Sequence, residues 1–233
     1  MGKRKDRLNQ FAVTGNYSYC SLYPHVLCSG VALLQLALQD RKRSVLNGRN
    51  HLSIHAPGAI VLGVTALDLW LSEAIVSLAL PDEQTRELLD GTLTGKYAQV
   101  YAAAHNRPPR NGSDLEILVD VRHEIVHHFP RPTRTPQHVP KWLPEFERQG
   151  IVLVAEHAAR TKVDFDPTQK LGSYGLAYWV FRVIERSVVD VIQDASEPRI
   201  QMQDCDVQNF ALYRSVCPPE ELGTFDKTVG HNV

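Results

Sequence analysis

The sequence lacks the features of several broad classes of protein. No stretch reaches the roughly 20 uninterrupted apolar residues that a membrane span requires, because the best candidate, Ala56 to Leu80, contains Asp68 and Glu73. The basic start, Met1 to Lys5, is followed by polar residues where a signal peptide has its apolar region. There is no internal repeat and no low-complexity segment. We therefore expect a soluble protein that is neither membrane-spanning nor secreted, and not a solenoid.

Cysteine and net charge are also scarce. The cysteines are too few for a disulfide framework, and none lies in a Cys-x-x-Cys pair: Cys20, Cys28, Cys205 and Cys217. We interpret them as reduced thiols of a cytoplasmic protein, and we expect no metal and no cofactor. The formal net charge of −1 provides no overall attraction for nucleic acid, so that a polyanionic partner must be held by a local basic patch.

The sequence does contain enough hydrophobic residues for a core, since they make up 43% of its 233 residues. They recur mainly with helical periodicity. The expected helices are His25 to Arg41, Gly58 to Leu80, Asp82 to Ala104, Ser113 to Phe129, Trp142 to His157 and Leu176 to Ala195, although the short apolar run within Trp142 to His157 is also compatible with an extended segment. The pattern predicts an all-α protein, an antiparallel bundle of about five helices. We divide the chain into a flexible basic segment (1–16), the bundle (17–195) and a tail of unassigned structure (196–233).

The helix that begins near Ser113 carries the strongest chemical signal. Ser113 with Glu116 has the spacing of a capping box, and Pro130 ends the helix. On a helical wheel Arg122 falls within the apolar stripe, where a permanent charge requires a partner or a solvent-filled cleft. One interpretation is therefore a buried ion pair between Arg122 and a core acid such as Asp68 or Glu73.

The segment Arg122-His123-Glu124-Ile125-Val126-His127 also has the form Arg, polar residue, three residues, His. This string resembles the motif of HEPN domains, which are helical bundles found in many prokaryotic toxins and defence ribonucleases. The preceding apolar helix, with Asp68 and Glu73, is similar to the acid-bearing helix of that family. The similarity extends over residues 25 to 195 in layout.

The resemblance implies metal-independent cleavage of RNA by a homodimer, with a 2',3'-cyclic phosphate as product. It implies that Arg122 and His127 are catalytic and that His123 assists them. It also makes an inhibitory or regulatory protein partner plausible, as for a toxin or a defence effector. Two further groups complete the expected site, the supporting acids Asp68, Glu73 and Glu124 and the RNA-binding cations Arg131, Arg134 and Lys141. The basic segment that holds these cations contains no acid, but it is equally compatible with an ordinary solvated loop.

Two alternatives remain open. His123 to His127 also fits His-Glu-x-x-His, in which two histidines bind zinc and the glutamate activates water. Pro130 and Thr133 occupy the positions of the glycine and third histidine of the metzincin extension, and no other third ligand is singled out. The second alternative is a HEPN-like module that pairs or binds without catalysis, in which Arg122 and His127 remain as a structural pair.

Overall fold

The computed structural model describes residues 21–46, 53–109, 112–127, 139–149, 151–152, 170–193 and 204–216. Within these ranges the secondary structure comprises eight α-helices and one 3-10 helix, and there is no strand. The prediction of an all-α protein is confirmed. The predicted number of about five helices is not, because the described ranges already contain more. The segment 1–16 lies outside the described residues.

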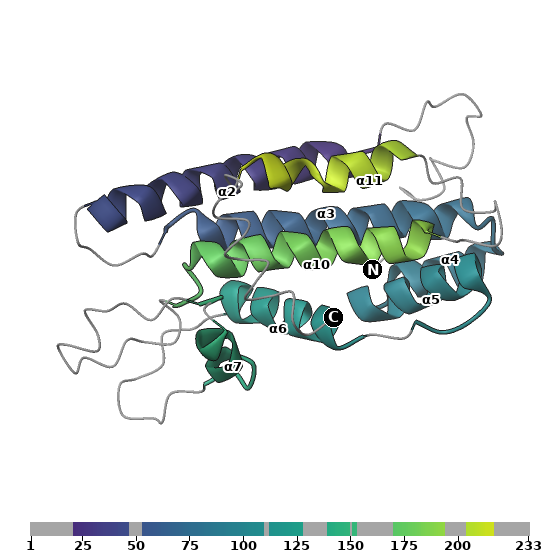
Figure 1. Ribbon diagram of the computed structural model, residues 1–233. Coiled ribbons are helices and arrows are strands. Elements are labelled where there is room, and N and C mark those ends of the chain that lie inside the picture. The colour runs from purple at the N-terminus through teal and green to yellow at the C-terminus, as the bar shows by residue number, and fades with distance from the viewer. Residues whose placement is uncertain are drawn as a thin grey trace, which may run out of the picture.

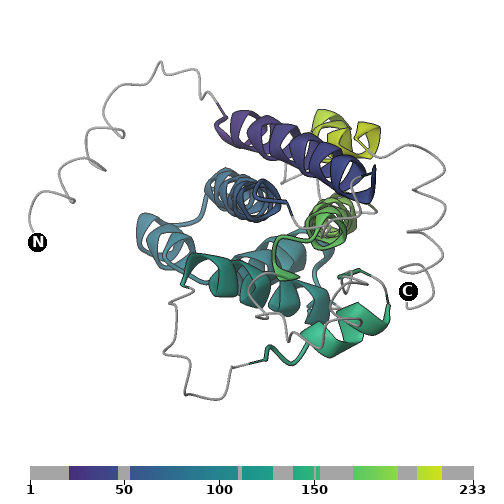
Figure 2. The same cartoon turned by 90° about the vertical axis from the view of Figure 1, so that its left-hand side faces the viewer.

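The helices form three layers (Figure 1). Their bounds are α2 (Tyr23–Leu46), α3 (Ala56–Ser77), α4 (Asp82–Leu89), α5 (Leu93–His105), α6 (Ser113–Val126), α7 (Leu143–Arg148), α10 (Tyr174–Ile192), α11 (Asp204–Phe210) and the 3-10 helix η1 (Leu212–Ser215). Helices α3 and α10 lie side by side in the middle layer, α2 and α11 cover one side, and α4, α5 and α6 cover the other (Figure 2). Helix α3 is thereby in contact with helices of both outer layers and with α10.

Helix α3 is apolar nearly all round its circumference, as the sequence predicts for a core helix. Residues such as Ile60, Leu67 and Leu71 are fully buried. By length and composition alone α3 is also long and apolar enough to cross a membrane, but 56% of its most apolar window is buried inside the bundle. More than half of this apolar window is therefore packed inside the protein.

Two glycines allow α2 and α3 to approach closely. A Cβ atom at Gly30 would lie 3.3 Å from the backbone nitrogen of Gly63 and 3.2 Å from the ring of Phe181. A Cβ atom at Gly63 would also lie 3.2 Å from the Phe181 ring. The Phe181 side chain of α10 therefore fills the space that these glycines leave, and three helices meet at this point.

The predicted helix Asp82 to Ala104 is in fact two helices, α4 and α5. The break falls at Gly91 and Thr92, where the Thr92 hydroxyl accepts a hydrogen bond from the backbone nitrogen of Gly95 at 3.2 Å and so caps α5. A glycine followed by a threonine is a typical signal for ending one helix and starting another, and the periodicity on either side concealed it.

Part of the C-terminal tail belongs to the core. Phe210 of α11 stacks on Tyr23, with ring centroids 5.3 Å apart, and meets the edge of Trp70. Asp206 accepts hydrogen bonds from the Tyr23 hydroxyl and from the indole nitrogen of Trp70. Helix α11 therefore packs against α2 and α3 although its sequence has no clear periodicity.

The close approach of α2 and α3 yields a stability prediction. Replacing Gly30 by leucine should lower the free energy of unfolding by about 1–3 kcal/mol, because the added side chain has no space between the helices. The gain in helix propensity over glycine, about 1 kcal/mol at most, reduces this loss but does not cancel it. The measurement is urea-induced unfolding.

The control variant is Gly112→Ser, because nothing lies within 4 Å of a Cβ atom built at Gly112. It should change the free energy of unfolding by no more than about 0.5 kcal/mol. Equal stability of the Gly30 variant and the unmodified protein would contradict the described helix packing.

Candidate functional site

Helix α6 carries the motif, and its start differs from the prediction. Ser113 is the first helical residue and Gly112 is the N-cap, with no side-chain hydrogen bond to the helix end. The predicted capping box of Ser113 and Glu116 is therefore wrong, because Ser113 lies one position too far into the helix to cap it. At the other end the helix is described to Val126, with His127 as its C-cap.

One side of α6 is in the core and the other faces solvent. Leu115, Leu118 and Val121 are buried against the bundle. Arg122 is exposed, and Val126, which follows it by one turn, is 48% exposed. The interpretation of Arg122 as one partner of a buried ion pair is therefore wrong, because the core covers only part of the arc that the wheel marks as apolar.

The motif residues occupy neighbouring rows on this exposed side. His123 and His127 are both exposed, and their rings contact each other with centroids 4.5 Å apart. At about 100° per residue, Val126 lies between Arg122 and His127 on the helix surface. No described residue makes a hydrogen bond or ion pair with the Arg122 guanidinium. The structure thus presents one guanidinium and two imidazoles to solvent, near the C-terminal end of one helix.

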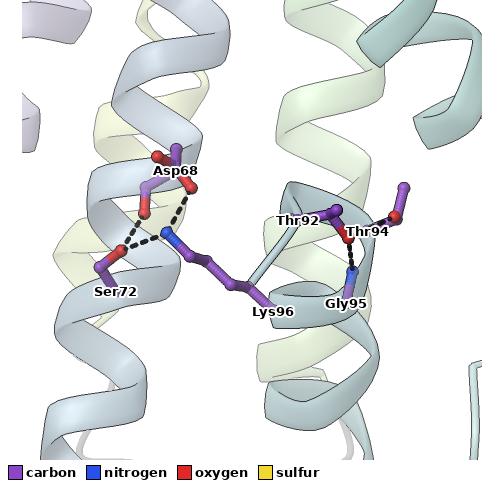
Figure 3. Close-up of polar contacts among 6 residues, drawn as sticks. All are labelled: Asp68, Ser72, Thr92, Thr94, Gly95 and Lys96. Atoms are coloured by element: carbon purple, nitrogen blue, oxygen red, sulfur yellow. Dashed lines mark hydrogen bonds and ion pairs between the residues drawn. The ribbon is translucent and has the colours of Figure 1, made fainter. Parts of the chain in front are cut away.

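The two core acids that the sequence offered as partners for Arg122 are engaged elsewhere. Asp68 accepts a hydrogen bond from the ammonium group of Lys96 at 2.8 Å, and Ser72 accepts a second one at 3.1 Å (Figure 3). Glu73 accepts hydrogen bonds from the Ser21 hydroxyl at 2.7 Å and from the backbone nitrogen of Leu22. Their contacts therefore tie α5 and the start of α2 to α3.

The remaining predicted site residues are only partly within the described ranges. Glu124 is half-buried, and Lys141, just before α7, is exposed. Arg131 and Arg134 lie outside the described residues. The expected basic strip is thus represented here by Lys141 alone.

A catalytic zinc site requires three protein ligands, and the histidine pair supplies two candidates. His123 and His127 lie one turn apart on one helix, with their rings in contact, as neighbouring zinc ligands do. Among the described residues, no group of three or more histidine, cysteine, aspartate or glutamate side chains is placed to hold a metal ion. The geometry of this part of the chain therefore supplies no third protein ligand beside the histidine pair.

A second concave site was not predicted from the sequence. A cavity of about 390 Å³ lies between the start of α6, α7, α10 and η1. Its wall combines apolar side chains, including Trp179 and Phe146, with charged ones, including Asp114 and Arg186. The sequence does show charged residues at helical spacing within the apolar helix α10, which indicates a partly polar face. It does not show which distant segments line the cavity opposite that face.

No protein-family model, no curated protein and no solved structure matches this chain.

The Lys96 contacts yield a second prediction. Lys96 is buried, at 6% exposure, so that Asp68→Ala should leave an ammonium group without its counterion and lower the free energy of unfolding by about 1–3 kcal/mol. Adding Lys96→Met should restore part of the loss, since the uncompensated charge is then removed. Urea unfolding of both variants provides the measurement. A double variant no more stable than Asp68→Ala alone would show that the ion pair has no such role.

Proposed function

We propose that the chain is a metal-independent endoribonuclease of the HEPN type. The observation that carries this proposal is the exposure of Arg122, His123 and His127 on one side of a helix whose other side is buried. None of the three is required for core packing, and Arg122 has no ion-pair partner among the described residues. A helix surface with a permanent cation beside two titratable imidazoles suits the recognition and cleavage of a phosphodiester.

The chemistry follows from the residue types. A histidine, His127 or its counterpart in a second copy, takes the proton of the RNA 2'-hydroxyl, and the resulting oxyanion attacks the adjacent phosphorus. Arg122 donates hydrogen bonds to the nonbridging phosphate oxygens and stabilises the additional negative charge of the transition state. The bond from phosphorus to the 5'-oxygen breaks, and a protonated imidazole supplies the proton to the leaving oxygen. The products are a 2',3'-cyclic phosphate and a 5'-hydroxyl.

The proposal includes a homodimer in which the two α6 helices face each other. The motif lies on an exposed helix surface, and a second copy supplies the opposite wall that encloses the scissile phosphate. The exposed Val126 between Arg122 and His127 provides an apolar contact for such a pairing. RNA is the proposed partner, and a regulatory protein that blocks this surface accords with a toxin or defence role. Asp68 and Glu73 are left out of the site because of their contacts elsewhere.

The proposed activity predicts RNA cleavage that persists in excess EDTA. Arg122→Ala and His127→Ala should each lower the cleavage rate at least 100-fold, an order of magnitude typical of losing a general acid or base or an anion-stabilising group. The measurement is cleavage of a mixed RNA pool by purified protein, with product ends analysed for the cyclic phosphate.

Matched control variants are available elsewhere on the surface. Arg86 of α4 and His25 of α2 are exposed, and their replacement by alanine should leave the rate unchanged. Cleavage abolished by EDTA and restored by zinc would support the metal site instead. A stable dimer that cuts no RNA under either condition would indicate a pairing module without catalysis.

The dimer yields a separate prediction. Val126→Glu should place two carboxylates opposite each other in the proposed pairing surface and weaken dimerisation at least tenfold, about 1.4 kcal/mol. Cleavage should fall in parallel, whereas the thermal stability of the monomer should not change because Val126 is half exposed. Light scattering over a concentration series measures the dimer. Unchanged dimerisation would show that this surface of α6 does not pair.

A further inference from the structure

The cavity beside α10 has charged side chains in its wall, and one ion pair among them, between Asp114 and Arg186, is long and partly exposed. It has a volume of about 390 Å³, within the range of sites for small organic molecules. Its position near the start of α6 is remote from the motif, because Asp114 and His127 lie at opposite ends of that helix. Binding of a ligand in this cavity is therefore independent of the proposed ribonuclease activity.

Two of the carboxylates in the cavity wall already have their hydrogen bonds satisfied. Glu185, which is buried, accepts from Arg214 through both oxygens, at 2.8 and 3.1 Å, and from the Tyr213 hydroxyl at 2.7 Å. Burial raises the pKa of Tyr213, and the bond to Glu185 raises it further, so that the phenol remains a donor. Hydrogen bonds from Arg148 and Gln149 lower the pKa of Glu145 to about 2. These acids need no ligand.

Asp114 and Arg186 differ from these groups. Arg186 and Asp114 form an ion pair whose N to O distance, 3.7 Å, is beyond hydrogen-bond distance, and their side chains are partly exposed, at 42% and 49%. Arg186 comes from α10 and Asp114 from the first turn of α6, so that opposite charges face each other from two walls of the cavity. Within the described chain neither makes a side-chain hydrogen bond. Arg182, the other arginine on this side of α10, has a contact of its own.

We propose that this cavity binds a small zwitterion with an apolar body, of the chemical class of a free apolar α-amino acid. The ligand carboxylate accepts hydrogen bonds from Arg186, and its ammonium group donates to Asp114. A simple anion would be repelled by Asp114 and a simple cation by Arg186, whereas a zwitterion satisfies both. The loose Asp114 to Arg186 contact is replaced by two charge-assisted hydrogen bonds.

The apolar part of the wall accommodates the body of the ligand. Trp179 and Phe146 meet edge to face, with ring centroids 4.7 Å apart, and Ile117 of α6 also lines the cavity. Burying an apolar side chain there removes it from water and adds affinity that glycine cannot gain. The site therefore prefers phenylalanine or leucine to glycine.

The test is isothermal titration of the full chain with L-phenylalanine and three analogues that each lack one feature. N-Acetyl-L-phenylalanine lacks the cation, L-phenylalanine methyl ester lacks the anion, and glycine lacks the body. We expect L-phenylalanine to bind and each analogue to bind at least about tenfold more weakly, the effect of losing one charge-assisted hydrogen bond or one buried side chain.

Two variants test which residue binds which charged group of the ligand. Asp114→Asn should weaken L-phenylalanine at least about tenfold while leaving the N-acetyl analogue unaffected or bound more tightly, since the repelling carboxylate is gone. Arg186→Gln should weaken L-phenylalanine equally but should not weaken the methyl ester. The controls are Asp120→Asn and Arg86→Gln, which change exposed residues outside the cavity wall and should not alter binding.

Three results would overturn the proposal. The first is that none of L-phenylalanine, L-leucine and L-tryptophan binds at concentrations up to about 10 mM, the upper limit of a weak metabolite site. The second is that the N-acetyl analogue or the methyl ester binds as tightly as L-phenylalanine, which would identify a site for an anion or a cation. The third is binding that neither Asp114→Asn nor Arg186→Gln weakens, in a protein whose circular dichroism is unchanged.

Discussion

Burial of α3 is the constraint on which the rest of the structure depends. This helix is apolar nearly all round, so that leaving it in water would be unfavourable and most of its surface has to be covered by other elements. Helices α2, α10, α5 and α6 each cover part of it (Figure 1). Gly30 and Gly63 allow a close contact between α2 and α3, and Phe181 fills the adjoining space.

The same constraint determines which residues of α6 are available for chemistry. Packing on α3 and α10 buries Leu115, Leu118 and Val121, and this fixes the rotation of the helix about its axis. Arg122 and His127 are then directed to solvent whether or not they have a function. The exposed position of Arg122 thus follows from core packing, whereas the residue types placed there do not.

Sequence patterns predict the long helices well because their apolar period reflects one continuous contact with the core. Helix α10 begins two residues before the predicted start and ends three before the predicted end, and its apolar residues, such as Leu176, Val180 and Ile184, are buried. The orientation of α6 about its own axis was not predicted correctly, because apolar residues at a helix end need not be buried. Val126, for example, is 48% exposed. Contacts between distant segments, such as Lys96 with Asp68 or Tyr213 with Glu185, leave no periodic signal and could not be predicted from the sequence.

A charged side chain in or near a core needs a counterion for stability, and most such groups in the described chain have one. Lys96 has Asp68, Glu185 has Arg214 and Lys170 has Glu147. The first two pairs each join two helices, and the third joins α7 to the segment before α10, so that the loss of any of them should appear first as a loss of stability. Arg122, by contrast, has no ion-pair partner among the described residues, and Asp114 and Arg186 form only a long, partly exposed ion pair at 3.7 Å. Charges that the fold leaves incompletely satisfied cost little when solvated, and they gain most when a ligand of complementary charge replaces water. The strength of the pairing within the protein therefore separates the two groups of charges. Lys96, Glu185 and Lys170 are paired for stability, whereas Arg122, and Asp114 with Arg186, remain available to a ligand.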